Sequence, residues 1–300
     1  MGQFNGRVVV VTGAGGGLGR AHALAFAAEG AQVVVNDVGS ASAESGADQS
    51  AAQAVVDEII AKGGVAAANT DSVASWDGSK GIIDQAVETF GDLHVVVNNA
   101  GIVRDRALVN MSEAEFDAVL AVNLKGTAAV SRWAASYWRE QSKAGRSEVR
   151  RIVNTTSGSG LFGNAGQANY ASAKMGVAAL TIVCAREFQR FGVQTNAIAP
   201  GARTPMTLAV PGADAMLKAP AEDGAFDKWH PRNTSPVVMY LATKQCPFNG
   251  QVFETLGGRV SLYKGWSPDW TVSEDRTWTV DELHAVTEDW PAGPPDMPQG

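Results

Sequence analysis

The sequence has little cysteine, no excess of basic residues and no long apolar run. Its 300 residues include two cysteines, Cys184 and Cys246, without partners at metal-like spacing. A formal net charge of −7 argues against nucleic acid as a partner, because phosphate backbones bind basic surfaces. No apolar run approaches the roughly 18 residues of a membrane span, and no signal region opens the chain. These absences favour a cytoplasmic protein with neither nucleic acid nor membrane as partner.

Histidine is also sparse, and its positions indicate no metal site. Four histidines lie far apart in the chain and lack ligand spacing. What the sequence has instead is 45% apolar residues and 33 glycines spread along its length, a composition typical of a folded domain. A chain of this length can form one α/β domain with a sizeable core, and we expect one domain here.

Short β-branched runs alternate with longer segments of helical periodicity, which is the pattern of repeated βαβ units. The expected strands are 7–12, 32–36, 64–69, 94–98, 151–155, 194–199 and 250–254. The expected helices are 17–29, 49–62, 77–90, 112–140, 169–191 and 236–243. Ser112 and Glu115 form a capping-box pattern at the start of the fourth helix. The sequence therefore predicts an α/β fold: a doubly wound parallel sheet of about seven strands with helices on both faces.

The chain changes character after its last predicted strand. We expect residues 1–261 to form the main domain, with a proline-rich substrate loop at 204–235 and a small polar loop at 39–47. Residues 262–300 contain several tryptophans, a short helix at 279–286 and a Pro/Gly-rich end. Aromatic residues at this density need burial, so we expect an arm that packs on the domain or on a neighbouring subunit.

The first strand leads directly into the glycine-rich segment Thr12–Gly19, which is followed by a helical pattern. Gly13, Gly17 and Gly19 let the turn adopt uncommon backbone angles and let a pyrophosphate approach the main chain, with Leu18 in the first helical turn. The helix N-terminus there supplies unpaired N–H groups to an anion. This context predicts a dinucleotide site, although glycine runs also form ordinary turns.

An acidic residue ends the second strand. Asp37 follows Gly19 by eighteen residues, where a carboxylate accepts hydrogen bonds from ribose hydroxyls and repels a 2′-phosphate. No arginine or lysine lies within the glycine segment to attract such a phosphate. Both observations favour NAD over NADP, while a turn or N-cap role for Asp37 stays open.

A tyrosine and a lysine share one face of a predicted helix. Tyr170 and Lys174 are four residues apart, so the phenol and the ammonium lie side by side. An ammonium and a cationic nicotinamide ring both stabilise phenolate, so we expect a lowered pKa for Tyr170, which then exchanges a proton with a substrate oxygen. Ser157 follows the fifth strand and Asn98–Gly101 follows the fourth. Strand ends in a parallel sheet share one edge, so these motifs converge on one crevice.

With these motifs the chain resembles the short-chain dehydrogenase/reductase superfamily from about residue 4 to residue 254. The motifs of the resemblance are the glycine segment, Asn98-Asn99-Ala100-Gly101, Asn123, Ser157, Tyr170 with Lys174, and Pro200-Gly201 with Thr204. The resemblance implies a Rossmann-like sheet and a nicotinamide cofactor. It also implies that Ser157 hydrogen-bonds the substrate oxygen, Tyr170 exchanges the proton, Lys174 holds the nicotinamide ribose, and Asn123 orients a relay water.

Further cofactor contacts follow from the same resemblance. It places Asp71 and Ser72 beside the adenine and Asn99 beside the adenosine ribose, with Gly101, Pro200, Gly201 and Thr204 also at the cofactor. It implies a homo-oligomer as well, with a tetramer favoured.

Three segments are similar to the hydroxyacyl-CoA dehydrogenase domain of the peroxisomal multifunctional β-oxidation enzyme and its bacterial single-domain relatives. They are 36–39, 98–106 and 163–170. The likeness makes 3-hydroxyacyl-CoA the first expected substrate, with a steroid side-chain thioester among the acyl-CoA candidates. A hydroxysteroid dehydrogenase and a non-catalytic NAD-binding regulatory protein are the alternatives. Arg104 and Arg106 could meet a CoA phosphate, but we favour solvated loop charges.

Overall fold

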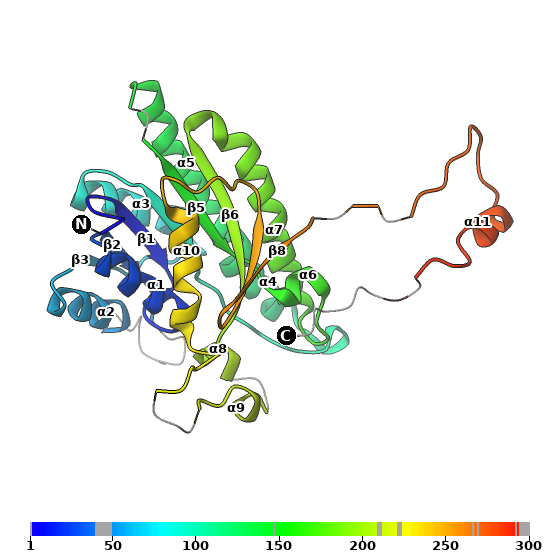
Figure 1. The fold of residues 1–300 in the computed structure, drawn as a ribbon, viewed down its shortest axis with the longest axis horizontal. Coiled ribbons are helices and arrows are strands. Elements are labelled where there is room, and N and C mark those ends of the chain that lie inside the picture. The colour runs from blue at the N-terminus through cyan, green and yellow to red at the C-terminus, as the bar shows by residue number, and fades with distance from the viewer. Residues whose placement is uncertain are drawn as a thin grey trace.

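Strands and helices alternate through most of the chain (Figure 1). The computed structural model describes residues 2–39, 50–146, 148–208, 212–220, 224–265, 267–268, 270–291 and 293. In these ranges eight strands form one sheet in the order β3-β2-β1-β4-β5-β6-β7-β8. The strands are β1 (Val8–Thr12), β2 (Gln32–Asn36), β3 (Val65–Asn69), β4 (Val95–Asn98), β5 (Arg150–Thr155), β6 (Val193–Gly201), β7 (Val252–Leu256) and β8 (Arg259–Tyr263). All neighbouring strands are parallel except β7 and β8.

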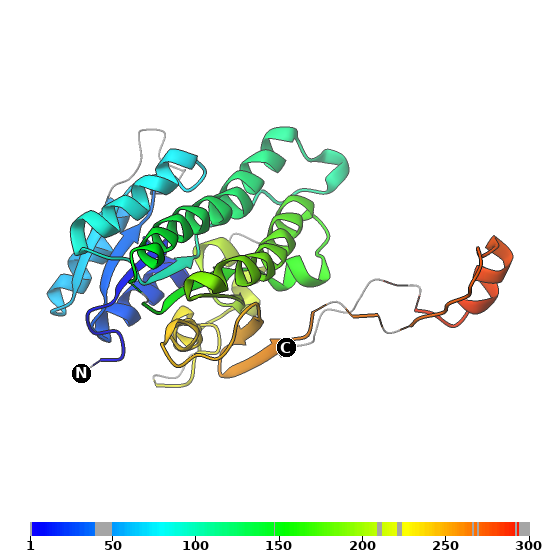
Figure 2. The same ribbon diagram turned by 90° about the horizontal axis from the view of Figure 1, so that it is seen from above.

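Helices cover both faces of the sheet (Figures 1 and 2). One face carries α1 (Gly17–Ala28), α2 (Ser50–Ala61) and α10 (Ser235–Ala242). The other carries α3 (Trp76–Phe90), α4 (Glu113–Leu120), α5 (Thr127–Lys143) and α7 (Ala168–Phe188). Shorter helices are α6 (Gly158–Phe162), α8 (Pro205–Leu208), α9 (Ala213–Met216) and α11 (Val280–Val286), with single turns at η1 (Leu108–Asn110), η3 (Gln189–Phe191) and η4 (Pro231–Asn233). The predicted doubly wound α/β fold is therefore confirmed.

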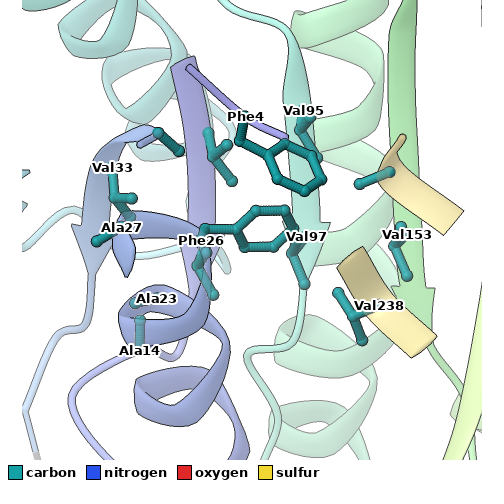
Figure 3. Close-up of a cluster of buried hydrophobic side chains, with 14 of the residues drawn as sticks. Phe4, Ala14, Ala23, Phe26, Ala27, Val33, Val95, Val97, Val153 and Val238 are labelled. Atoms are coloured by element: carbon teal, nitrogen blue, oxygen red, sulfur yellow. The ribbon is translucent and has the colours of Figure 1, made fainter. Parts of the chain in front are cut away.

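The central strand β1 is buried on both sides, which explains its unbroken valine run. Val9 and Val11 point into one hydrophobic cluster, and Val8 and Val10 point into the cluster on the opposite face. In the first cluster, shown in Figure 3, Phe4 and Phe26 pack edge to face with ring centroids 4.8 Å apart. A strand with apolar side chains on both faces is typical of a parallel sheet between two helical layers.

The sequence analysis missed the eighth strand. Gly257 and Gly258 form a two-residue turn after which β8 runs antiparallel to β7, with Leu256 opposite Arg259. Gly257 has a positive φ of 59°, the conformation that such hairpin turns need. The sheet consequently continues to Tyr263, two residues past the predicted end of the domain at 261.

The long helix expected at 112–140 is divided. The capping box of Ser112 and Glu115 is present at the start of α4. A π-helical stretch, η2 (Ala121–Gly126), then separates α4 from α5. This wider turn contains Asn123, and π-bulges in helices often mark functional positions.

After β8 the chain leaves the domain and projects away from it (Figures 1 and 2). The short helix expected at 279–286 is present as α11, with a capping box of Thr279 and Glu282. The Trp270 side chain, at 53% exposure, is not packed on the domain. The expectation that the arm packs on its own domain or on a neighbouring subunit stays a prediction. The expected loop at 39–47 lies outside the described residues except for Gly39.

Candidate active site

The glycine turn between β1 and α1 has the shape that an anion needs. Gly13 and Gly17 have positive φ angles of 62° and 52°. A Cβ on Gly19, in the first turn of α1 beside Leu18, would lie 2.1 Å from the Gly13 carbonyl oxygen. The N-cap residue Gly16 has no side chain to cap the helix, and a Cβ there would meet no atom of the described residues within 4 Å. The first N–H groups of a helix have no partner within the helix, so the start of α1 fits a dinucleotide pyrophosphate.

Asn99 braces this turn from the neighbouring strand β4. Its Nδ2 donates to the carbonyl oxygens of Thr12 and Gly13, both at 3.0 Å. In return, Thr12 Oγ1 accepts from the backbone N–H groups of Asn99 and Ala100 at 3.1 Å. Sequence reasoning placed Asn99 beside the adenosine ribose and overlooked Thr12. The structure shows that the two side chains fix the shape of the turn.

Asp37 lies against the same turn from the end of β2. Its Oδ2 accepts from the N–H of Gly15 at 2.8 Å and its Oδ1 from the N–H of Gly39 at 2.9 Å. The second bond is the local turn role left open above. The first holds the carboxylate beside the glycine segment, where a bound adenosine ribose would lie.

Buried amides hold Asp71 at the end of β3. Asn69 Nδ2 donates to Asp71 Oδ2 at 3.0 Å, and Asn69 Oδ1 accepts from the Asp71 N–H at 3.0 Å. Asn36 Nδ2 donates to the same Asn69 Oδ1 at 2.6 Å. Asp71 and Ser72 are exposed, whereas Asn36 and Asn69 are buried. The sequence analysis named the exposed pair and missed the two amides that position it.

Tyr170, Ser157 and Lys174 come together where β5 ends and α7 begins. The Ser157 hydroxyl is near enough to the Tyr170 phenol to lower its pKa, and Lys174 Nζ lies 5.6 Å from the centroid of the phenol ring. Lys174 is only 2% exposed, and its Nζ donates to the Thr155 carbonyl oxygen at 2.9 Å. The structure thus gathers three predicted residues on one surface of the sheet edge.

Asn123 completes the group from η2. Its Nδ2 donates to the carbonyl oxygens of Ile102 and Val119 at 2.9 and 3.0 Å. Its Oδ1 is buried and has no hydrogen-bond partner among the described residues. A Cβ on Gly101 would lie 2.5 Å from this Oδ1 and 3.5 Å from Lys174 Nζ. Both polar atoms therefore face the small space beside Gly101, which suits a water molecule between them.

Burial is the largest influence on the pKa values of Tyr170 and Lys174. Burial raises the pKa of Tyr170, while the hydrogen bond from Ser157 lowers it and the Asp105 carboxylate raises it. Burial also lowers the pKa of Lys174 to about 8, so the amine is still largely charged at neutral pH. The sequence-based expectation of a lowered pKa for Tyr170 is therefore wrong for the protein without cofactor, because that reasoning omitted the desolvation of the phenol.

The predicted substrate loop at 204–235 begins directly over the glycine turn. A Cβ on Gly17 would lie 3.4 Å from the Thr204 side chain. Arg203 anchors the loop through an ion pair with Asp227 and a hydrogen bond to the Leu217 carbonyl oxygen at 2.8 Å. Just before it, Pro200 and Gly201 end β6 at the same sheet edge.

Two other charged or titratable side chains, Arg106 and His22, have structural partners. Arg106 pairs with Glu115, with Nε and Oε1 2.9 Å apart, which agrees with a loop charge rather than a CoA contact. His22 is fully buried, its Nδ1 lies 2.9 Å from Ser235 Oγ, and burial lowers its pKa to about 3. Within the described ranges, no group of three or more His, Cys, Asp or Glu side chains is arranged to hold a metal ion. Nor is any helix of those ranges long and apolar enough to cross a membrane.

Comparison with known proteins shows the family to which the chain belongs. The family description "short chain dehydrogenase" matches residues 7–211, which is more than half of the chain. The chain therefore belongs to the short-chain dehydrogenase family. It is an oxidoreductase that acts on CH–OH groups, and enzymes of this family use NAD or NADP.

Several individual members of the family are similar to the chain over most of its length. The chain is 45% identical over 298 residues to the hydroxyacyl-CoA dehydrogenase ChsB1 of Mycobacterium tuberculosis, covering 97% of this chain and 90% of the relative. It is 43% identical over 256 residues to peroxisomal multifunctional enzyme type 2 of Drosophila melanogaster, covering 85% of this chain and 40% of that longer protein. A crystal structure of a short-chain dehydrogenase from Mycobacterium avium superposes with a TM-score of 0.85 at 50% identity, covering 96% and 95% of the two chains. The resemblance seen in the sequence is confirmed.

Two glycine-to-alanine substitutions compare a position in the turn where a methyl group clashes with one where it does not. Gly19→Ala should lower the melting temperature and reduce dinucleotide affinity at least about tenfold, because the added methyl meets the Gly13 carbonyl oxygen. Gly16→Ala is the matched control and should leave the melting temperature unchanged, because its methyl points into open space. Thermal unfolding and titration with NAD measure both. Equal effects of the two substitutions would contradict this description of the turn.

Proposed function

We propose that the protein is an NAD-dependent dehydrogenase that interconverts a secondary alcohol and a ketone. The observation that carries the proposal is the convergence of Asn123, Ser157, Tyr170 and Lys174 beside the glycine turn. The four side chains come from η2, the end of β5 and α7, so only the folded chain brings them together. A role as ordinary surface polar residues does not explain a buried ammonium beside a buried amide oxygen that has no hydrogen-bond partner in the described ranges.

In this proposal the side chains manage the substrate oxygen and its proton. NAD bound at the glycine turn would supply the hydride acceptor for oxidation or, as NADH, the hydride donor for reduction. Ser157 donates a hydrogen bond to the substrate oxygen, and Tyr170 accepts the alcohol proton during oxidation or donates a proton to the carbonyl during reduction. Lys174 holds the nicotinamide ribose and stabilises the phenolate. Asn123 Oδ1 holds a water through which the proton reaches solvent.

The choice of NAD over NADP rests on Asp37. Its carboxylate is held at the glycine turn by the Gly15 N–H, so a 2′-phosphate bound there would meet a negative charge. The remaining cofactor assignments belong to the same proposal: Asp71 and Ser72 at the adenine, Asn99 at the adenosine ribose, and Gly101, Pro200, Gly201 and Thr204 along the cofactor.

Cofactor preference tests this assignment. We expect wild-type protein to bind NAD at least about tenfold more tightly than NADP, and Gly16→Arg combined with Asp37→Ser to reverse the order. The new arginine fits because position 16 faces open space and has an extended backbone. Dissociation constants for both dinucleotides give the answer. A wild-type preference for NADP would refute the role given to Asp37.

For the substrate we propose the 3-hydroxyacyl-CoA/3-ketoacyl-CoA pair, including steroid side-chain thioesters. The support is the likeness to a relative named as a hydroxyacyl-CoA dehydrogenase over nearly the whole chain. A hydroxysteroid dehydrogenase is the second candidate from the sequence, and no observation in the fold favours it. A non-catalytic NAD-binding regulatory protein is the third, and it leaves the assembled proton-transfer residues without a purpose.

Turnover by purified protein tests the reaction and its class of substrate. With NAD, wild-type protein should oxidise members of a panel of 3-hydroxyacyl-CoAs, and Tyr170→Phe should slow turnover by at least about 100-fold while NAD binding persists. Activity on hydroxysteroids alone would favour the second candidate. Undiminished activity of Tyr170→Phe would contradict the mechanism, and full NAD binding with no turnover of any panel member would favour the regulatory alternative.

We further propose a homo-oligomer, with a tetramer favoured, whose C-terminal extension at 262–300 packs on a neighbouring subunit. Exposed apolar side chains along the described part of this arm, including Val280 and Leu283 of α11, support the proposal. A seven-residue helix is not stable alone in water and needs a surface to pack against.

Two further predictions from the sequence stay part of the proposal. The substrate loop stays assigned to 204–235. The cytoplasm stays the predicted compartment, with which the unpaired, buried Cys184 and Cys246 agree.

Removal of the arm tests its role in assembly. Light scattering during size-exclusion chromatography should give a multiple of the chain mass for the full protein and a smaller assembly for a chain ending at Lys264, because β8 and the domain end before that residue. A monomeric full-length protein would overturn the oligomer. If the truncated chain forms the same assembly as the full protein, the proposed role of the arm is wrong and the proposed oligomer stands.

A further inference from the structure

Asn169, the residue before Tyr170, is fully buried and bonds to the backbone of three segments. Its Nδ2 donates to the carbonyl oxygens of Arg104 and Glu115 at 3.0 and 3.1 Å. Its Oδ1 accepts from the N–H of Tyr170 at 2.7 Å. Arg104 lies in the loop that follows β4 and Glu115 lies in α4. One buried side chain therefore joins this loop and α4 to the start of α7.

The first turn of α7 needs such a connection because it contains Tyr170. The helix begins at Ala168, so the N–H of Tyr170 is one of the first N–H groups, which have no acceptor within the helix. Helix ends also fray more easily than helix interiors. The phenol, however, can exchange a proton only while its oxygen stays within hydrogen-bond reach of the substrate oxygen. Asn169 supplies an acceptor for this N–H and ties the turn to its neighbours.

Asn123 makes a matching pair of hydrogen bonds to the same two segments. Its Nδ2 donates to the carbonyl oxygen of Ile102 in the loop after β4 and to that of Val119 in α4. Ile102 precedes Arg104 by two residues, and Val119 follows Glu115 by four, which is about one helical turn. The two buried amides therefore bridge the loop and α4 at neighbouring positions.

We propose that Asn169 is a positioning residue, which holds the Tyr170 phenol in a fixed place relative to the amide of Asn123. The inference rests on the proposed function, in which Tyr170 exchanges the proton and Asn123 holds the relay water. Because both amides are bonded to the same loop and the same helix, the two groups that handle the proton keep a constant spacing. A misplacement of about 1 Å at a reacting group can cost about 100-fold in rate.

Other hydrogen bonds hold the segment before α7 to the same loop. Gln167 Nε2 donates to Asp105 Oδ2 at 2.7 Å, and the N–H of Arg106 donates to the Gly166 carbonyl oxygen at 2.8 Å. These two bonds do not involve Asn169. We therefore expect loss of the Asn169 amide to loosen the first turn of α7 rather than to unfold the site.

Asn169→Ala tests the inference, and Asn196→Ala is its matched control. Asn196 is also fully buried and lies in β6, away from the strand end that faces the site. Its Nδ2 donates to the Phe248 carbonyl oxygen at 2.8 Å, and its Oδ1 accepts from the Gln251 N–H at 3.0 Å. Each substitution removes a buried amide that bonds to the backbone, so both should lower the melting temperature.

The two variants should differ in turnover at a temperature where both are folded. With a 3-hydroxyacyl-CoA that the wild-type protein oxidises, Asn169→Ala should lower kcat at least about tenfold, while KM and the Kd for NAD stay within about threefold of wild type. Asn196→Ala should keep the wild-type kcat. A kcat that falls equally in both variants, or in neither, would overturn the inference.

Asn169→Ser keeps the inference testable if the alanine variant does not fold. Serine is favoured near helix starts, but its short side chain does not span the distance from α7 to both carbonyl oxygens that Asn169 reaches. We expect this variant to be folded and to show the same loss in kcat with little change in KM. A wild-type kcat in Asn169→Ser would overturn the inference.

A second readout does not depend on turnover. Exchange of the Tyr170 amide hydrogen with solvent deuterium reports how firmly the first turn of α7 is held. The exchange should be about fivefold faster in Asn169→Ser than in wild type, and unchanged in Asn196→Ala. Equal exchange in all three proteins would overturn the inference even if the enzyme turns over as proposed. Faster exchange in Asn169→Ser, in a protein that turns over no alcohol, would support the hold of Asn169 on Tyr170 while the proposed function fails.

Discussion

The architecture depends on one constraint, the meeting of all parallel strand ends at a single edge of the sheet. The order in which successive strands are added to the sheet changes direction at β1, because β2 lies on one side of it and β4 on the other. The glycine turn after β1 consequently lies beside Asn99 after β4, and the two segments exchange four hydrogen bonds through Thr12 and Asn99. Ser157, placed by the next strand β5, then lies within reach of the same edge. Ligands bind at such reversal points in open α/β sheets.

Around that edge the protein buries polar groups that cost free energy unless they have a purpose. Lys174 is almost fully buried, and its Nζ donates to a backbone carbonyl oxygen rather than to a carboxylate. Burying a charge without an opposite charge is costly. Among the described residues, Asn123 Oδ1 has no hydrogen-bond partner in the same space. Sites that tolerate such costs are typically those that bind a ligand or move a proton, which is why the geometry supports a catalytic interpretation.

The features that sequence reasoning predicted are those with a local signal. The strand from Val8 to Thr12, the turn that follows it and the Tyr170/Lys174 spacing each follow from a short stretch of chain. The hairpin at Gly257 and Gly258 also has a local signal, because a Gly-Gly pair between two strand-like segments favours a two-residue turn. The Asp105–Gln167 bond joins residues 62 positions apart, and no pattern in either segment indicates it. The desolvation of Tyr170 depends on what packs around it, so the sign of its pKa shift needed the folded structure.

A crystal structure of the protein with NAD measures the central claim directly. The account predicts the pyrophosphate at the N-terminus of α1, the adenosine ribose at Asp37, and the nicotinamide ring beside the Tyr170 hydroxyl with Lys174 at its ribose. A dinucleotide bound away from the glycine turn would contradict the account. So would a nicotinamide ring out of reach of Tyr170.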